Sequence, residues 1–292
     1  MVTIEIKKSL GIKFSVIIPF FNGANTLDRA IQSVLSQKYP DWELILVNDG
    51  STDQSEQISQ YYMSNPKVSY FYQENIGVSA ARNLGASNAI GEWLIFLDSD
   101  DEFENSLFDS LMNSNSQDQE VLVWGFDWVF PNGESKSFVQ NDEKYIPFLS
   151  GTFTIKREVF DSLHGYDENL RFGENTELFH RLNLASLILK KIPIIGLTYY
   201  DSTNGGSKNL QNVIDSNLLI LNKHKQTLPN HTKHLYHQII GVNQLRFRKF
   251  SQARKHLWIA YRLKPYKLST LLRLLISLSP LISSKIYLDS VK

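Results

Sequence analysis

The chain has 292 residues, a formal net charge of zero, 42% hydrophobic residues and no cysteine. This length and hydrophobic content exclude a disordered chain and suit one large domain, or a domain with an appendage. Without cysteine there are no disulfides, thiolate zinc sites or cysteine nucleophiles, so any metal must be held by oxygen or histidine. There is no run of about 18 apolar residues and no basic-then-apolar leader within residues 1–13, so we expect a cytoplasmic protein.

Charge is distributed unevenly along the chain. From Ser216 onward fourteen Lys and Arg residues stand against one acid, Asp289, a net charge of +13. Residues 1–215 hold the other sixteen bases and twenty-nine acids, a net charge of −13. A split of this size predicts two parts with different partners, residues 1–215 and residues 216–292.

Strand and helix patterns alternate through residues 14–101. We expect strands at Phe14–Ile18, Glu43–Val47, Val68–Gln73 and Trp93–Leu97, and helices at Thr26–Gln37, 54–63 and Gly77–Ala89. Pro19 is expected to stop the first strand. Strands that alternate with helices at this spacing predict right-handed βαβ units and a mostly parallel sheet with helices on both faces. Residues 14–101 are therefore predicted to form a nucleotide-binding half.

Three carboxylates follow the apolar strand Trp93–Leu97. They belong to Asp98, Asp100 and Asp101, and they are predicted to lie at the strand end, where open α/β sheets bind ligands. Crowded carboxylates repel one another unless a cation or hydrogen-bond donors compensate them, and hard oxygen ligands favour Mg²⁺ or Mn²⁺. The alternative is a solvated acidic turn that caps the next helix.

The two commonest nucleotide motifs are missing. No GxGxxG follows the first strand and no GxxxxGK[ST] occurs, which argues against a dinucleotide dehydrogenase and a P-loop enzyme. Binding would instead depend on Asp49, on Arg82 and on the acidic residues at 98–101, with Phe21 stacked on a base. The alternatives are that Phe21 is an ordinary hydrophobic plug and Arg82 a surface charge.

Two long segments carry a resemblance to a known family. They are SVIIPFFNGANTLDRAIQSVLSQKYPDWELILVNDGSTD and GVSAARNLGASNAIGEWLIFLDSDD. In order and spacing they resemble the family 2 inverting glycosyltransferases of the GT-A fold, over about ninety residues. The resemblance implies a nucleoside-diphosphate sugar as donor, most often UDP-linked, and Mn²⁺ or Mg²⁺ as cofactor. It also implies that residues 102–215 form the acceptor half of a catalytic domain.

The resemblance assigns roles by position. Pro19 and Phe21 line the base, Asp49 accepts its imide N–H, Arg82 lies near the diphosphate, Asp98 approaches the ribose, Ser99 lies next to it in the nucleotide site, and Asp100 ligates the metal.

The acceptor-side segment resembles the family with one departure. His164-Gly165-Tyr166-Asp167-Glu168 matches the GGFDE-like turn, and GENTEL from Gly173 matches the GEDxEL helix start, whose Asp serves as general base. Here that position is Asn175, and an amide cannot take a proton from an attacking hydroxyl. Three alternatives remain: Glu174 or Glu177 acts as the base, the protein is impaired or regulatory, or the residue was changed deliberately to slow turnover. Both glutamates are also favoured in a first helical turn by the helix dipole.

A further departure follows the expected strand Lys191–Tyr200. Many relatives carry a metal-binding histidine in the next loop, but residues 201–209 contain none. Asp100, the diphosphate and water would then hold the cation, and Lys208 would offset diphosphate charge. Beyond the acidic residues at 98–101, residues 120–130 and the Ser/Lys stretch after Gly133 predict a hairpin. Trp124 is expected in the core, whereas Trp128 is either core or a sugar platform.

Helical patterns begin at Leu218 and include His234–Phe250, Ser251–Lys264 and Tyr266–Leu288. Apolar faces beside clustered bases predict an interfacial helix on anionic lipid. The alternatives are packing on the catalytic part or on another subunit of a homo-oligomer. Nucleic acid is not an expected partner, because bases without a recognised motif are weak evidence.

Together these features predict an inverting, metal-assisted glycosyltransferase that acts on a glycan or lipid-linked acceptor in bacterial surface polysaccharide synthesis. It would lie in the cytoplasm or peripherally at the inner face of the cell membrane. The alternative is a catalytically impaired scaffold that binds sugar nucleotides. A nucleotidyltransferase is a third option, but its Gly-rich start after the first strand is absent.

Overall fold

A computed structural model of the chain describes residues 13–114, 119–140, 147–201 and 208–288. The chain divides into two compact units, one of residues 1–168 and 174–203 and one of residues 169–173 and 204–292. The boundary predicted from charge, between residues 215 and 216, falls inside helix α7 (Leu210–Lys223). Two predictions lie outside the described residues: the absence of a leader, which depends on residues 1–12, and the absence of a loop histidine, which depends on residues 202–207.

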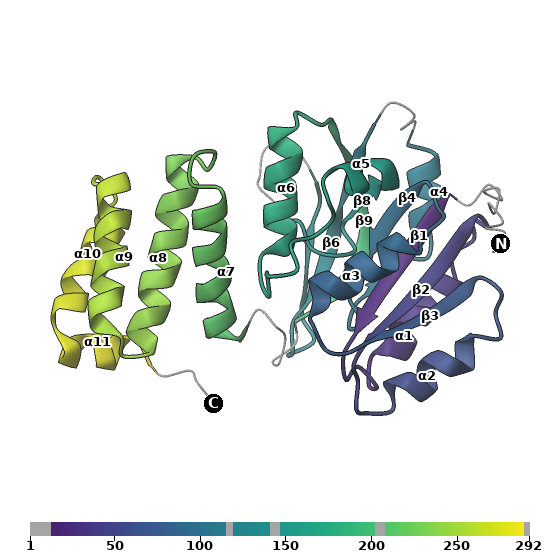
Figure 1. The fold of residues 1–292 in the computed structure, drawn as a ribbon, viewed down its shortest axis with the longest axis horizontal. Coiled ribbons are helices and arrows are strands. Elements are labelled where there is room, and N and C mark those ends of the chain that lie inside the picture. The colour runs from purple at the N-terminus through teal and green to yellow at the C-terminus, as the bar shows by residue number, and fades with distance from the viewer. Residues whose placement is uncertain (1–12, 115–118, 141–146, 202–207, 289–292) are drawn as a thin grey trace, which may run out of the picture. The chain divides into compact units, whose positions relative to one another are not determined.

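The described strands of the first unit form one sheet. They are β1 (Phe14–Phe20), β2 (Trp42–Asp49), β3 (Val68–Gln73), β4 (Trp93–Phe96), β5 (Glu102–Phe103), β6 (Val121–Val129), β7 (Ser135–Phe138), β8 (Phe153–Lys156) and β9 (Leu189–Tyr200). Their order is β3-β2-β1-β4-β8-β6-β9-β5, with β7 paired to β6 (Figure 1). The parallel sheet predicted from residues 14–101 is confirmed for β1 to β4, whereas β8 runs antiparallel to both β4 and β6.

Strand β1 continues past Pro19 to Phe20, so the expected stop at this proline was wrong. Pro19 pairs with Val47 of β2, but β4 pairs with β1 only as far as Ile17. The backbone polar groups of alternate residues in a strand point to the same neighbouring strand, so the backbone of Pro19 points to the β4 side, as that of Ile17 does. Strand β4 has already ended at this level of the sheet. Its missing N–H therefore removes no hydrogen bond from the sheet.

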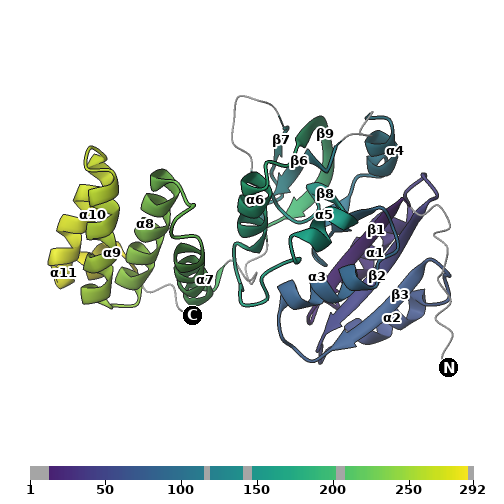
Figure 2. The same cartoon turned by 45° about the horizontal axis from the view of Figure 1, so that its top comes forward.

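Helices cover both faces of this sheet, as predicted (Figure 2). On one face α1 (Leu27–Leu35), α2 (Ser55–Tyr62) and α4 (Leu107–Met112) pack into one hydrophobic core. On the other face α3 (Val78–Ser87), α5 (Arg157–Ser162) and α6 (Glu174–Leu184) pack into a second core. Strand residues alternate between the two cores, Val16 in the first and Ile17 in the second, which explains why β1 is apolar throughout.

The hairpin predicted after residue 120 is confirmed by the antiparallel pairing of β6 with β7. Trp124 is fully buried in the first core, as expected. Trp128 is half-buried and stacks on Phe130 with ring centroids 5.5 Å apart. It is therefore a packing residue of the hairpin in this structure.

The second unit is helical and consists of α7, α8 (Asn230–Arg246), α9 (Phe250–Leu263), α10 (Leu268–Leu278) and α11 (Pro280–Ile286). Helix α7 begins earlier than the expected Leu218, because the side chain of Asn209 accepts hydrogen bonds from the N–H groups of its first turn. The single helix expected at Tyr266–Leu288 is broken: Ser279 caps α11 and Pro280 occupies its first position. Among the described helices none is long and apolar enough to span a bilayer.

Candidate active site

The loops that follow β1 and β2 are fastened to each other. The side chain of Asn22 accepts a hydrogen bond from Thr52 N–H at 2.8 Å, and the carboxylate of Asp53 accepts one from Ala24 N–H at 3.0 Å. Both loops lie at the carboxyl ends of parallel strands, where open sheets bind ligands. The polar residues after β2 thus build the rim of the candidate site.

Asp49 ends strand β2 and is only 4% exposed. One carboxylate oxygen accepts a hydrogen bond from Gln73 Nε2 at 2.7 Å and the other from Gly77 N–H at 3.0 Å. The next residue, Gly50, has φ +78°, and a Cβ there would lie 2.8 Å from the backbone nitrogen of Asn75. Asp49 therefore fixes the turn that begins α3, and glycine is required beside it.

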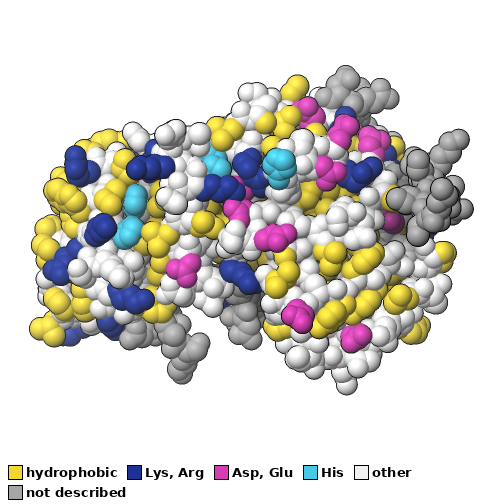
Figure 3. Space-filling model, viewed as in Figure 1, with side chains coloured by type: hydrophobic (Ala, Val, Ile, Leu, Met, Phe, Trp, Pro, Cys, Tyr) yellow, Lys and Arg dark blue, Asp and Glu magenta, His cyan; other side chains and the backbone are white. Residues whose placement is uncertain are grey.

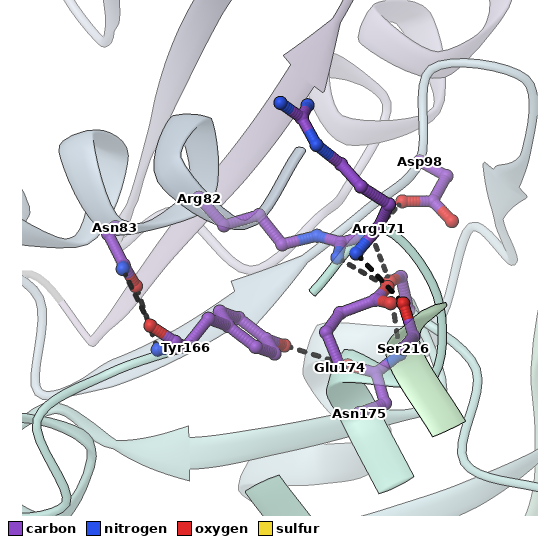
Figure 4. A network of polar contacts seen from close by, with 9 residues as sticks. Arg82, Asn83, Asp98, Tyr166, Arg171, Glu174, Asn175 and Ser216 are labelled. Carbon is purple, nitrogen blue, oxygen red and sulfur yellow. Dashed lines mark hydrogen bonds and ion pairs between the residues drawn. The ribbon is translucent and has the colours of Figure 1, made fainter. Parts of the chain in front are cut away.

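Arg82 lies on α3, is 2% exposed and connects three distant segments (Figure 4). Its Nη2 lies 2.6 Å from Asp98 Oδ1 and donates to Ser150 Oγ at 2.7 Å, while Nη1 donates to Glu174 Oε1 at 2.8 Å. Burial opposes the guanidinium charge, but the carboxylates of Asp98 and Glu174 raise the pKa of Arg82 above its usual value. Arg82 is thus a permanent cation that holds both acids.

Asn175, in the first turn of α6, is 9% exposed and held on both sides. Its Oδ1 accepts a hydrogen bond from Tyr166 O–H at 2.8 Å, and its Nδ2 donates to Ser150 Oγ at 3.4 Å. Burial raises the pKa of Tyr166 above its usual value, so the phenol stays a donor at neutral pH. The amide oxygen of Asn175 is therefore engaged by Tyr166.

Glu177 lies one helical turn further on and has a different environment. It is 0% exposed and forms an ion pair with Arg181 at 2.8 Å. Arg181 also donates to the carbonyl oxygens of Leu163 and Gly165. In this arrangement Glu177 anchors the turn before α6, and a substrate hydroxyl has no access to it. Glu174, with a side chain 15% exposed, is the accessible glutamate.

The acidic segment after β4 is partly buried. Burial and the neighbouring Asp98 raise the pKa of Asp100 to about 6. Burial, then Asp100 and Asp98, raise the pKa of Asp101 well above its usual value. Asp101 Oδ1 accepts a hydrogen bond from Tyr200 N–H at 3.0 Å, whereas Oδ2 is buried without a hydrogen-bond partner among the described residues. Full ionisation of Asp100 and Asp101 beside Asp98 is therefore unfavourable in the protein alone.

Arg29, which had no predicted role, also contacts this segment. Its guanidinium donates to the carbonyl oxygen of Asp100 and lies 3.7 Å above the Tyr200 ring. It thus connects α1, the acidic segment and the end of β9.

A divalent cation would fit the donors of the acidic segment. Asp98 and Asp100 offer hard oxygen atoms, and a cation would relieve the repulsion that raises the pKa of Asp100. However, no group of three or more His, Asp or Glu side chains within the described ranges is arranged to hold a metal ion. Further ligands, such as phosphate oxygens and water, would have to complete the site.

The remaining predicted nucleotide residues lie near the same edge of the sheet. Pro19 is buried in β1, while Phe21, just beyond it, is 49% exposed. Ser99 lies close to the loop after β1, since a Cβ on Gly23 would be 3.2 Å from Ser99 Oγ. The structure thus joins Arg82 and Asp98 to the catalytic candidates Glu174 and Asn175 in one network. Asp49 instead accepts hydrogen bonds from Gln73 and Gly77, and Glu177 pairs with Arg181.

Two residues of this network, Ser150 and Tyr166, had no predicted role. Tyr166 lies in the turn that resembles the family, which was a usable signal. Ser150 gave no signal of its own. It precedes Gly151, which has φ +81° and would place a Cβ 2.6 Å from the Leu197 side chain.

A profile of Glycosyl transferase family 2 matches residues 15–172, more than half of the chain. The chain belongs to glycosyltransferase family 2. An uncharacterized glycosyltransferase of Rickettsia typhi is 32% identical over 191 residues, 60% of this chain and 59% of that protein. The cholesterol galactosyltransferase of Borreliella burgdorferi is 41% identical over 112 residues, 38% of this chain and 31% of that protein. The match thus spans less than two thirds of the length of these relatives.

Residues 1–349 of S. aureus TarS have the same fold. The two structures superpose with a TM-score of 0.62 at 20% sequence identity, covering 92% of this chain and 88% of that chain. The same protein in complex with UDP-GlcNAc gives a TM-score of 0.61 at 19% identity and equal coverage. The GT-A fold predicted from the sequence, with a C-terminal helical region, is thereby confirmed.

Proposed function

We propose that this family 2 glycosyltransferase moves a sugar from a UDP-sugar to a hydroxyl group of a glycan or lipid-linked acceptor, with inversion at the anomeric carbon. The observation that carries the proposal is the buried Arg82, which holds Asp98 from the end of β4 and Glu174 from α6. A charged network at the carboxyl ends of parallel strands suits a nucleotide ligand. The complexes of TarS with UDP and UDP-GlcNAc support the choice of nucleotide.

The proposed reaction is a single displacement. A bond forms between the acceptor oxygen and the anomeric carbon, the bond from that carbon to the phosphate oxygen breaks, and the acceptor hydroxyl loses its proton. Arg82 orients Asp98 and Glu174, and its charge favours the leaving diphosphate. A bound Mn²⁺ or Mg²⁺, held by Asp100, would supply further stabilisation of the leaving group.

The site has no obvious side chain to accept the proton of the acceptor hydroxyl. Asn175 offers an amide that cannot take a proton, and its oxygen is engaged by Tyr166. Glu177 is buried against Arg181. Glu174 remains, with one oxygen held by Arg82 and no partner for the other among the described residues. We therefore propose that the chain turns over slowly, with Glu174 as the remaining base.

A second candidate function is a scaffold that binds sugar nucleotides without transfer. The observation in favour of the scaffold is that Asn175 stands where a general base is expected and is hydrogen-bonded on both sides, by Tyr166 and by Ser150. A screen of nucleotide sugars with Mn²⁺, measuring binding, donor hydrolysis and transfer to membrane extracts, separates the two functions. Turnover supports the transferase. Binding without turnover, in the wild type and in Asn175→Asp, would favour the scaffold.

The acceptor is proposed to be lipid-linked, as in assembly of a bacterial surface polysaccharide, with the enzyme peripheral at the inner face of the cell membrane. The Borreliella burgdorferi relative is named for a lipid acceptor, cholesterol, which supports this choice. Acceptor extracts prepared with and without the lipid fraction test it. Equal transfer to both extracts would contradict a lipid-linked acceptor.

A further inference from the structure

Helix α10 has its apolar side outward. Thr270 and Ser277 are 0% exposed, whereas Leu268, Leu272 and Leu275 are 76%, 57% and 53% exposed. At 100° per residue the three leucines form one stripe and the two polar residues lie opposite. Amphipathic helices in water normally bury the apolar stripe, so this arrangement is inverted.

The inward polar side is fixed by hydrogen bonds. Gln238 of α8 donates to Thr270 Oγ1 at 2.9 Å, and Ser283 of α11 donates to the carbonyl oxygen of Ile276 at 2.7 Å. Turning α10 to bury its leucines would break the bond to Gln238 and leave a buried amide unsatisfied. The orientation of the helix is therefore specified by its polar contacts.

The short helix α11 continues the same character. Ser283 is 0% exposed, whereas Leu281, Ile282 and Ile286 are 81%, 52% and 52% exposed. By helical geometry the exposed Lys285 lies among these three side chains. We use the name leucine face for nine exposed side chains of residues 268–288, namely Leu268, Leu272, Leu275, Leu278, Leu281, Ile282, Lys285, Ile286 and Leu288.

The charge around this face has one sign. Residues 216–288 contain thirteen Lys and Arg residues and no Asp or Glu. Figure 3 shows Lys and Arg side chains interspersed with hydrophobic ones over the helical unit. Lys267, just before the leucine face, and Lys285, within it, are both exposed. An apolar surface within a field of bases, without acids, matches a surface that is apolar inside and anionic outside.

We propose that the leucine face binds the interface of an anionic lipid bilayer. The leucines and isoleucines enter the boundary between headgroups and acyl chains, while Lys267 and Lys285 extend to the lipid phosphates. The bases of the unit add attraction that salt screens. Lipid binding by α10 and α11 does not depend on the proposed transfer chemistry, because no residue of the network around Arg82 takes part.

The test uses the full chain and sedimentation with vesicles of phosphatidylcholine, with and without phosphatidylglycerol, at low and high salt. We expect binding to the anionic vesicles that weakens with salt. Leu272→Ser/Leu275→Ser should weaken it about tenfold or more, because less apolar area is buried. The matched control Leu218→Ser/Leu235→Ser alters exposed leucines of α7 and α8 and should bind like the wild type.

Two charge-reversal variants separate the effect of lysines at the leucine face from the effect of the protein's net charge. Lys267→Glu/Lys285→Glu should weaken binding about tenfold more than Lys38→Glu/Lys136→Glu, which changes the net charge equally in the first unit. The inference would be overturned by a full chain that ignores anionic vesicles at low salt. It would also be overturned if Leu272→Ser/Leu275→Ser, folded by circular dichroism, bound like the wild type. A concentration-dependent dimer lost in that variant, without lipid binding, would assign the face to a second copy instead.

Discussion

Arg82 and Glu174 lie 92 positions apart in the chain, yet the arginine donates to the glutamate at 2.8 Å inside the first unit. The pair joins α3, from the segment 14–101, to α6, from the segment 102–215. Because Arg82 also holds Asp98, a single buried guanidinium sets the spacing of two acids that lie far apart in the chain.

Replacing Arg82 should destabilise the protein strongly. In Arg82→Ala the carboxylates of Asp98 and Glu174 lose their buried partner, and breaking such a pair costs about 3–5 kcal/mol. Urea unfolding measures the loss. Lys38→Ala, at an exposed position of the same unit, should change the free energy of unfolding by less than about 0.5 kcal/mol. Equal stability of both variants would mean that the network contributes nothing.

Asn175→Asp should raise the initial rate of transfer or donor hydrolysis. A positioned general base typically contributes about 10²- to 10⁴-fold, and the Asp would keep the hydrogen bond from Tyr166 O–H. UDP affinity should hardly change, because the two side chains are nearly isosteric. Asn88→Asp, on the exposed end of α3, is the control. An unchanged or lower rate, with Glu174→Gln inactive, would show that Glu174 already serves fully as the base.

Glu177→Gln should lower stability without a specific effect on chemistry. The change leaves the partly exposed Arg181 beside a neutral partner and loosens the carbonyl contacts of the preceding turn, at a cost of about 1–3 kcal/mol. Rates corrected for the folded fraction, alongside urea midpoints, separate the two effects. A stable but inactive Glu177→Gln would assign this residue to catalysis.

Asp100→Ala should remove the Mn²⁺-dependent part of UDP binding. The diphosphate would lose the cation that bridges it to the acidic segment, whereas base contacts would persist. Calorimetry with UDP, with and without Mn²⁺, measures this difference. Asp161→Ala, at an exposed position of α5, should keep the metal dependence. If Asp100→Ala retains it too, the acidic segment serves only as a helix cap.

Stability should fall below about pH 6.5 through two histidines of the helical unit. Nδ1 atoms of His237 and His256 lie 2.9 Å apart, and burial, then His256, lowers the pKa of His237 to about 4. As pH falls, His237 binds a proton in the unfolded chain before it does so in the folded chain. The contribution of neutral His237 to the free energy of unfolding is therefore full above about pH 6.5 and is lost as pH falls towards 4. Thermal midpoints of the wild type should drop more steeply over this window than those of His237→Gln/His256→Gln. Parallel curves would exclude the pair.

Local sequence patterns determined the first seven elements of the first unit. Apolar runs and helical spacing gave β1 to β4 and α1 to α3, because burial on both faces leaves a continuous apolar strand. The stop at Pro19 failed because it depended on where β4 ends. The length of a neighbouring strand cannot be read from the residues around a proline.

Motif resemblance identified the family and most members of the candidate site, but not how they are connected. Glu174 and Glu177 are equivalent by helical spacing, and only tertiary contacts separate them: one is held by Arg82, the other is buried against Arg181. Ser150 entered the network without any signal, because its contact with Arg82 spans 68 positions. Long-range pairing of single polar groups leaves no periodic trace in a sequence.

The amphipathic pattern of residues 266–288 was visible in the sequence, but its direction was not. Periodicity shows that leucines share one side of a helix and says nothing about which side faces the protein. The hydrogen bond from Gln238 to Thr270 decides this, and it turns the leucines outward. The sequence by itself determined the family, the parallel sheet and the amphipathic helices, whereas only the tertiary structure decided which side chains meet, because each helix or strand places its polar groups against partners from elsewhere in the chain.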